Sequence, residues 1–363
     1  MMRLTTILAL YLACGSCLSS PGDRAGYDEA VGEAAGEGVA VVIDDGLAAI
    51  RHLDAGALLL WSSAPQWSAS LDAERGGTWR ITVDNVLADA ALAATGPDGR
   101  ALTVTREAGD YPASLRFSID LPAGRTRLRL TLPDERDEAP FRFALLSDVQ
   151  TAIDDVGDIF AAVEAEPEVR FLLGAGDLAQ RGTRQELRRF QRELRAFSLP
   201  YYTTLGNHDI AEEGGYQELF GRGNFHFVFR GVHFTMLDSA AATLDPAVYG
   251  WLEGWLDEGR SATHVVAMHI PLLDPIGTRN GGFASRHEAG KILALLARGG
   301  VDLTLYGHIH SYYRFDNAGI PALISGGGGA LPERFDHVGR HFLVVEVGAD
   351  GGYLGSRVVE VDD

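Results

Sequence analysis

The residues best suited to chemistry in this chain lie in five short polar motifs, each of which follows an apolar run. The motifs are Asp148-Val149-Gln150, Gly176-Asp177, Gly206-Asn207-His208-Asp209, His269 and Gly307-His308-Ile309-His310. Carboxylates, imidazoles and amide oxygens of this kind are ligands for hard or borderline divalent metal ions. About six or seven such ligands exceed what one ion needs, so the pattern predicts two ions roughly 3.5–4 Å apart.

The apolar runs before these motifs predict buried strands, and the segments between them predict helices. The expected strands are Phe141 to Leu146, Val169 to Leu173, Tyr201 to Leu205, Val232 to Leu237, His264 to Met268 and Leu303 to Tyr306. Capping boxes at Thr183-Arg-Gln-Glu186 and Ser285-Arg-His-Glu288 predict helix starts. Strands that alternate with helices indicate an α/β layered domain over residues 140–363. Its motifs would meet at the carboxyl ends of the strands, where ligands bind in such sheets.

Residues 39–135 have a different pattern, with short alternating segments separated by turn signals and without a strong helix. This predicts a small all-β antiparallel sandwich of the immunoglobulin or fibronectin type. Pro122-Ala123-Gly124 predicts a hairpin between the strands on either side of it. No cluster of His, Cys or carboxylates marks a site there. A spacer role and a role in substrate or surface binding both remain open.

The first residues are typical of an export signal. Arg3 precedes the apolar run Leu4 to Ala13, and Cys14 follows it in the place of a lipid-modified cysteine. Residues 1–18 are therefore interpreted as a signal or lipoprotein segment, and residues 19–38, which lack an apolar period, as a flexible tether. We expect an exported protein that is periplasmic or anchored in a membrane as a lipoprotein, or otherwise secreted.

The overall charge limits the partners of this 363-residue chain, whose net charge is −19. Proteins that bind nucleic acid or anionic membranes in general neutralise phosphates with Lys and Arg, so neither is an expected partner. A small phosphorylated substrate stays compatible with an acidic protein if metal ions supply the local positive charge. Membrane contact is expected only through a lipid anchor on Cys14.

The order of the motifs resembles the signature of the calcineurin-like metallophosphoesterase superfamily from Phe141 to about His310. The resemblance implies a layered α/β/β/α sandwich, here preceded by the small all-β sandwich. The stretch from Gly307 to Tyr312 and the preceding β-sandwich are similar to the purple acid phosphatase-like branch. That branch has a metal-binding Tyr where this chain has Gln180, so no purple colour is expected.

The resemblance also implies a binuclear centre of divalent transition metal ions, which would be Mn, Fe or Zn. The implied ligands are Asp148 and His310 for the first ion, Asp177 as the bridge, and Asn207, His269 and His308 for the second ion. Gln150 stands where most members have His. Its amide would be a weaker ligand of the first ion, or a water would take that place.

The remaining polar residues near the motifs have roles other than metal binding, and some of them have two open assignments. His208 is implied to stabilise the transition state and to protonate the leaving oxygen, while Asp209 is either its partner or a turn residue. Arg279 and Arg286 either bind substrate phosphate or are solvated. The histidines on or beside apolar strands, His226 and His264 among them, are interpreted as structural.

The function expected from these residues is hydrolysis of a phosphomonoester or phosphodiester by a hydroxide that bridges two divalent metals. A monoesterase is slightly favoured over a diesterase. The alternative is a non-catalytic binding protein whose metal site is degenerate because of Gln150.

Overall fold

The computed structural model describes residues 20–135, 137, 139–211, 215–277, 281–333 and 337–361. The predicted signal segment with Cys14 and the predicted substrate residue Arg279 lie outside the described residues. Among the described residues, no helix combines the length and the apolar character needed to cross a bilayer.

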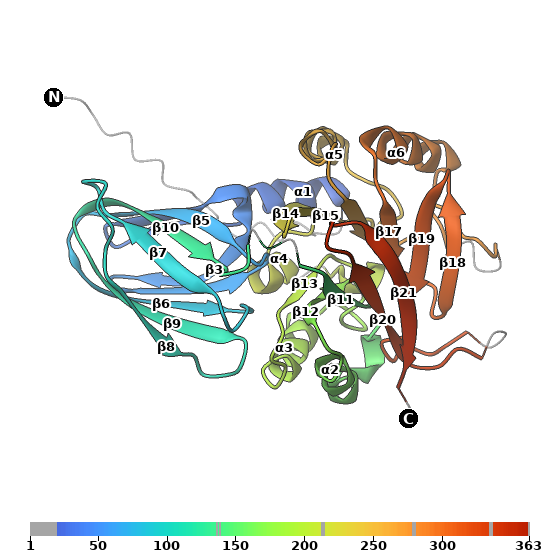
Figure 1. Cartoon of the computed structure of the whole chain (residues 1–363), viewed down its shortest axis with the longest axis horizontal. Helices are drawn as coiled ribbons and strands as arrows, with labels where there is room; N and C mark the ends of the chain where they lie inside the picture. The colour runs from blue at the N-terminus through green and yellow to red at the C-terminus, as the bar shows by residue number, and fades with distance from the viewer. Residues whose placement is uncertain are drawn as a thin grey trace.

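Two five-stranded sheets pack face to face in the N-terminal part of the chain (Figure 1). The first sheet has the order β1 (Glu33–Gly36), β2 (Val39–Ile43), β5 (Trp67–Ala73), β10 (Gly124–Thr131) and β7 (Ala91–Thr95). The second has the order β3 (Ala48–Asp54), β4 (Ala57–Ser62), β6 (Gly77–Asp84), β9 (Ser114–Leu121) and β8 (Val104–Ala108). Alternate side chains of each strand fill the space between the sheets, as Trp67, Ala69, Leu71 and Ala73 do on β5.

Two details of this sandwich differ from the sequence predictions. β4 and β6 pair in parallel, because β5 between them belongs to the opposite sheet and returns the chain in the same direction. The predicted hairpin around Gly124 is wrong, since β9 pairs with β6 and β8 whereas β10 pairs with β5 and β7. The tight turn there carries the chain from one sheet to the other.

The predicted flexible tether over residues 19–38 is also wrong for its described part. Helix α1 (Pro21–Ala30) begins at Ser20, whose hydroxyl accepts a hydrogen bond from the Asp23 N–H at 3.1 Å. Arg24 is buried and donates to both carboxylate oxygens of Asp238, at 2.5 and 3.1 Å. Asp28 accepts hydrogen bonds of 2.9 Å from the backbone N–H groups of residues 223 and 224. Buried polar pairs rather than an apolar stripe hold this helix, so hydrophobic periodicity could not reveal it.

The C-terminal part is a layered α/β/β/α sandwich, which confirms the predicted fold class. One sheet has the order β13 (Tyr201–Thr203), β12 (Val169–Gly174), β11 (Phe141–Leu146), β20 (His341–Val347) and β21 (Tyr353–Glu360). The other has the order β14 (Phe225–Phe229), β15 (Val232–Leu237), β16 (His264–Met268), β17 (Leu303–Tyr306), β19 (Ile320–Ser325) and β18 (Tyr312–Asn317). Aromatic rings fill the interface of the two sheets, with Phe143 and Phe234 edge to face at 5.3 Å.

Helices cover both outer faces of this pair of sheets (Figure 1). α2 (Gly157–Glu164), α3 (Arg184–Glu193) and the short α4 (Tyr216–Phe220) pack on the side of β11–β13. α5 (Pro246–Glu258) and α6 (Arg286–Gly299) pack on the side of β15–β17. Both predicted helix starts are confirmed, because Thr183 and Ser285 accept hydrogen bonds from the N–H groups three residues on, at 3.2 Å each.

Candidate metal centre

The candidate metal ligands follow strands whose carboxyl ends meet at one edge of the two sheets. β11 and β12 run parallel, and so do β12 and β13, which places the loops with Asp148, Asp177 and Asn207 side by side. In the second sheet β16 and β17 are parallel, and His269 and His308 follow them directly. The predicted convergence of five loops is what this topology produces.

The loop backbone is unusual at the ligands themselves. Asp148, Gln150, Asp177 and His308 have positive φ values of 63°, 47°, 57° and 70°. Such left-handed conformations are costly for residues other than glycine and cluster at functional sites. Gly206 is needed nearby, because a Cβ on it would lie 2.1 Å from an Asp177 carboxylate oxygen. The chain therefore fixes the direction of the Asp177 carboxylate by close backbone packing.

Three of the predicted ligands form a compact buried group. Ligand atoms of Asp148, Asp177 and His269 lie within 4.8 Å of one another, and all three side chains are buried. Asn207 adjoins them with its Oδ1 3.0 Å from His269 Nε2, and His310 Nε2 lies 3.4 Å from Asp148 Oδ1. That Asp148 oxygen is buried without a hydrogen bond. A buried carboxylate oxygen without a donor fits a bound cation better than a purely structural role.

The imidazoles are oriented by backbone carbonyl groups. His269 Nδ1 lies 2.8 Å from the Ala175 carbonyl oxygen, and His310 Nδ1 lies 2.7 Å from that of Leu331. In the neutral form of each ring, Nδ1–H donates to its carbonyl and Nε2 faces the carboxylates with its lone pair, which is the arrangement usual for a metal-binding histidine. Because these partners are main-chain atoms, no side-chain motif in the sequence signals them.

The carboxylates and His269 shift each other's protonation. Burial opposes ionisation of Asp177, but the facing His269 and the His208 N–H outweigh burial and hold the pKa of Asp177 below its ordinary value. Burial alone would lower the pKa of His269, yet the charges of Asp177 and Asp148 raise this pKa to about 9. Without metal the imidazole thus carries a proton at neutral pH and takes the place of a cation. A divalent ion would have to displace that proton.

Gln150 lies inside the group and is buried. Its amide nitrogen donates to Asp177 Oδ2 at 2.9 Å and is 3.3 Å from His310 Nε2. The side chain therefore lies between the Asp177 carboxylate and His310, beside the place expected for the first ion. A contribution of its amide oxygen to metal binding would require rotation of the amide group.

His208 and Asp209 have distinct positions in the loop after β13. His208 Nδ1 lies 2.8 Å from the Gln180 carbonyl oxygen, while its backbone N–H donates to Asp177 Oδ1 at 2.8 Å. Asp209 is buried and accepts hydrogen bonds from the N–H groups of residues 178, 179 and 206 at 2.9–3.1 Å. Burial and the charge of Asp177 raise the pKa of Asp209 to about 8, and these N–H bonds act in the opposite direction. Asp209 thus joins the loops after β12 and β13, and the imidazole of His208 is oriented by Gln180 instead.

Other residues singled out by the sequence lie outside the acidic group. Arg286 is exposed in the first turn of α6. Three histidines on β14–β16, His226, His233 and His264, pack with ring centroids 5.0–5.8 Å apart. Burial lowers the pKa of each of these imidazoles. Neutral packed rings agree with the structural role expected for them.

Comparison with known proteins confirms the resemblance carried by the motifs. Residues 141–312 match the family model of the calcineurin-like phosphoesterases, a class of hydrolases that uses divalent metals. A 3',5'-cyclic-nucleotide phosphodiesterase from Nostoc sp. is 27% identical over 164 residues, which are 42% of this chain and 59% of the relative. The chain thus spans less than two thirds of that relative.

Solved structures with a related arrangement include two phosphatases. A purple acid phosphatase from yellow lupin is 14% identical, with a TM-score of 0.49, over 82% of this chain and 72% of the lupin chain. A dimetal phosphatase from Danio rerio is 15% identical, with a TM-score of 0.47, over 61% of this chain and 99% of its own.

Proposed function

We propose that this protein hydrolyses a phosphate ester with two divalent metal ions held at the loop edge of its layered sheets. The observation that carries the proposal is the buried group of Asp148, Asp177 and His269, in which one carboxylate oxygen of Asp148 lacks a hydrogen bond. Asn207, His308 and His310 would complete the ligand set, with Asp177 between the ions. When bound, the ions would supply Lewis acidity toward the phosphoryl group and make water a stronger acid.

The protein's own residues would donate the proton that the leaving group needs and would hold the loops of the site in place. With Nδ1 of His208 engaged by the Gln180 carbonyl, Nε2 is the ring nitrogen left to donate a proton to the leaving oxygen. Asp209 would keep the two catalytic loops in register through its three backbone contacts. The positive charge of bound metal ions would offset the carboxylates and attract the phosphate, so no basic surface is required at this site.

A phosphodiester is the first substrate class to test. The Nostoc relative is a cyclic-nucleotide phosphodiesterase by name, which supports a diester, whereas the preceding β-sandwich first suggested a monoesterase. Export, with a lipid anchor on Cys14, is part of the same proposal and would place the substrate outside the cytoplasm.

The decisive experiment measures metal content per chain together with hydrolysis of p-nitrophenyl phosphate and bis-p-nitrophenyl phosphate after loading with Mn, Zn or Fe. About two metals per chain with turnover of either ester supports the proposal, and the faster ester identifies the class. One metal or none, with no turnover, would favour the non-catalytic binding protein in which Gln150 has disabled the site.

A further inference from the structure

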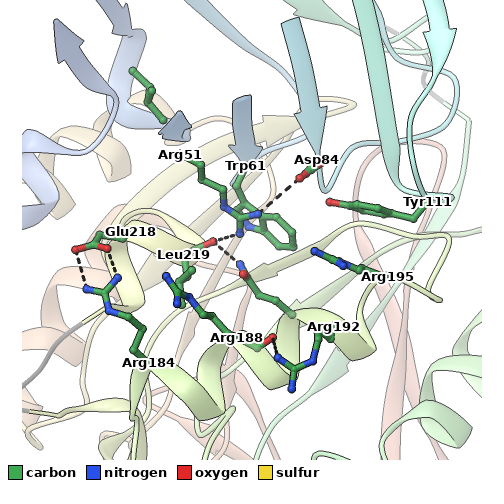
Figure 2. Close-up of a pocket in the computed structure, with 12 residues that line it drawn as sticks. Arg51, Trp61, Asp84, Tyr111, Arg184, Arg188, Arg192, Arg195, Glu218 and Leu219 are labelled. Atoms are coloured by element: carbon green, nitrogen blue, oxygen red, sulfur yellow. Dashed lines mark hydrogen bonds and ion pairs between the residues drawn. The ribbon is translucent and has the colours of Figure 1, made fainter. Parts of the chain in front are cut away.

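A second polar cavity lies between the N-terminal sandwich and helix α3, and it shares no residue with the metal centre (Figure 2). Its volume is about 510 Å³, within the range of small-ligand sites. One wall comes from the sheet of β3, β4 and β6, with Arg51, Trp61 and Asp84. The other comes from α3, the turn after it and α4. A neighbouring cavity of about 570 Å³ shares Asp84, Tyr111, Arg192 and Arg195 with it.

The lining is strongly basic in a protein whose net charge is −19. Five arginines line it, Arg51, Arg184, Arg188, Arg192 and Arg195, against only two carboxylates, those of Asp84 and Glu218. Both carboxylates are already engaged. Glu218 is paired with Arg184 at 3.0 Å, and Asp84 accepts the Ser114 hydroxyl at 2.8 Å and lies 3.7 Å from Arg51.

Three of the arginines have no acidic partner. None of the ion pairs among the described residues includes Arg188, Arg192 or Arg195. They stand at helical spacing on α3 and the turn after it, and all three line the cavity, where Arg192 also donates a hydrogen bond to the Arg188 carbonyl oxygen at 3.5 Å (Figure 2). In a protein this acidic, exposed arginines on a helix surface usually form ion pairs with nearby carboxylates. Glu218 also acts on Arg188 at longer range, but its ion pair is with Arg184, so the five arginines of the lining still exceed its two carboxylates.

The deepest of these cations is held in place and repelled by another. Arg51 donates to the Leu219 carbonyl oxygen and stacks on Trp61, 4.2 Å from the ring centroid. Burial, together with the positive charge of Arg195, lowers the pKa of Arg51 to about 10 despite the nearby Asp84. Arg51 is still protonated at neutral pH, so two guanidinium groups repel each other across the cavity. An anion between them would remove that repulsion.

We propose that this cavity binds a small organic phosphate that carries two or more negative charges. Guanidinium groups match phosphate oxygens with paired hydrogen bonds, and three unpaired arginines suit a dianion or trianion. The concave shape and the acidic remainder of the protein disfavour an extended polyanion such as a nucleic acid or an anionic bilayer. The site is distinct from the metal centre and does not rest on its proposed function.

The test is calorimetric titration of the full protein, before metal loading, with methylenediphosphonate, a diphosphate analogue that would otherwise also bind the metal ions. We expect the double variant Arg188→Gln/Arg195→Gln to weaken binding about 10-fold or more. The reason is that each substitution removes a charge-assisted hydrogen bond to phosphate, which is stronger than a hydrogen bond between neutral groups. Both side chains are exposed, so the fold is not at risk, and circular dichroism would verify this. Asp177→Asn, which alters the metal centre, is expected to change the affinity less than about 2-fold.

The single variants Arg188→Gln and Arg189→Gln form the matched pair, since each removes one positive charge from α3, and Arg189 pairs with Asp154 outside the cavity. The proposal is overturned if the double variant binds as tightly as wild type. It is also overturned if Arg189→Gln weakens binding as much as Arg188→Gln, or if Asp177→Asn abolishes it. Binding to phosphatidylglycerol vesicles that depends on Arg188 and Arg195, without binding of methylenediphosphonate, would replace it with a membrane contact.

Discussion

The metal centre and the arginine cavity hold opposite charges and hold them in opposite ways. In the metal centre the carboxylates are buried, and the imidazoles of His269 and His310 are fixed by main-chain carbonyls at 2.7–2.8 Å. In the cavity, Arg188 on α3 and Arg195 in the turn after it are exposed and form no ion pair among the described residues, although Arg195 lies 6.0 Å from the centre of the Tyr111 ring. The first arrangement suits a small cation that needs short, directed bonds, whereas the second suits a larger anion that long side chains can follow. The two proposed sites thus differ in rigidity as well as in charge.

The largest effect should come from removing the shared carboxylate of the rigid site. Asp177→Asn should reduce metal content from about two ions to fewer than one and lower ester hydrolysis by at least about 10³-fold, on the order of 4 kcal/mol. The physical reason is that only a carboxylate can offer one charged oxygen to each ion. Elemental analysis after gel filtration and a turnover assay would measure both quantities.

The control for this change is Asp257→Asn, an exposed carboxylate paired only with Arg260 on the surface of α5. It should behave as wild type. Retention of two ions by Asp177→Asn would show that the buried group is not the metal centre.

A smaller loss should follow removal of the proton donor without loss of metal. His208→Ala keeps the backbone N–H that contacts Asp177 Oδ1 at 2.8 Å, so metal content should stay at the wild-type value. Turnover should fall about 10²–10⁴-fold for an ester with an alkyl leaving group, which needs a proton. The fall should be much smaller for a nitrophenyl ester, because nitrophenolate leaves without one.

The comparison of the two leaving groups identifies the role of His208. An equal loss with both esters would mean that the imidazole only shapes the site. His287→Ala, an exposed histidine in the first turn of α6, provides a control that should not change either rate.

The same contrast explains how much the sequence could predict. Candidate ligands such as Asp177 and His308 stand shortly after apolar strands, so local patterns locate both the strands and the candidate site. The arginine cavity has no such pattern, because Arg51 comes from one sheet and Arg188 from a helix far along the chain. Helix α3 was predicted from its apolar face. Its arginines lie on the opposite, polar face, for which hydrophobic periodicity predicts only contact with solvent.

Some of the fold also lay beyond local patterns. Helix α1 is held by the buried Arg24–Asp238 pair across 214 residues of sequence, and no window of sequence contains both partners. The sequence predicted a turn at Gly124. The residues of the turn do not determine whether β10 pairs with the preceding strand β9 or crosses to the opposite sheet. Contacts between residues far apart in the sequence determine both the docking of α1 and the strand partner of β10.

Metal binding should depend on pH through the protonation of His269. In the metal-free protein the raised pKa of His269, about 9, means that the imidazole is protonated below that pH. Since a metal needs the neutral ring, the apparent affinity should fall about tenfold for each pH unit below 9. Between pH 8 and pH 6 the loss would be about 100-fold, measurable by competition with a chelator of known affinity.

Proton release gives an independent check of this dependence. Calorimetry of Mn binding at pH 7 in two buffers of different ionisation enthalpy should report about one proton released per metal-free site. Release of no proton would mean that His269 is neutral before binding or is not a ligand.

The smallest predicted effect concerns the residue that departs from the family pattern. The Gln150 amide nitrogen faces Asp177 Oδ2 at 2.9 Å, and this contact would have to be exchanged for one through its oxygen if the side chain bound metal. Gln150→His would offer a ring nitrogen directly, and we expect it to tighten binding of the first ion about 10-fold, or about 1.4 kcal/mol.

Gln150→Ala is the matched comparison for the role of the wild-type amide. If it weakens binding, the wild-type amide is a ligand. If affinity is unchanged in Gln150→Ala and raised in Gln150→His, Gln150 only fills the space beside the ion. An affinity that falls in Gln150→His would show instead that the site is built around the amide, and the resemblance would then not extend to this position.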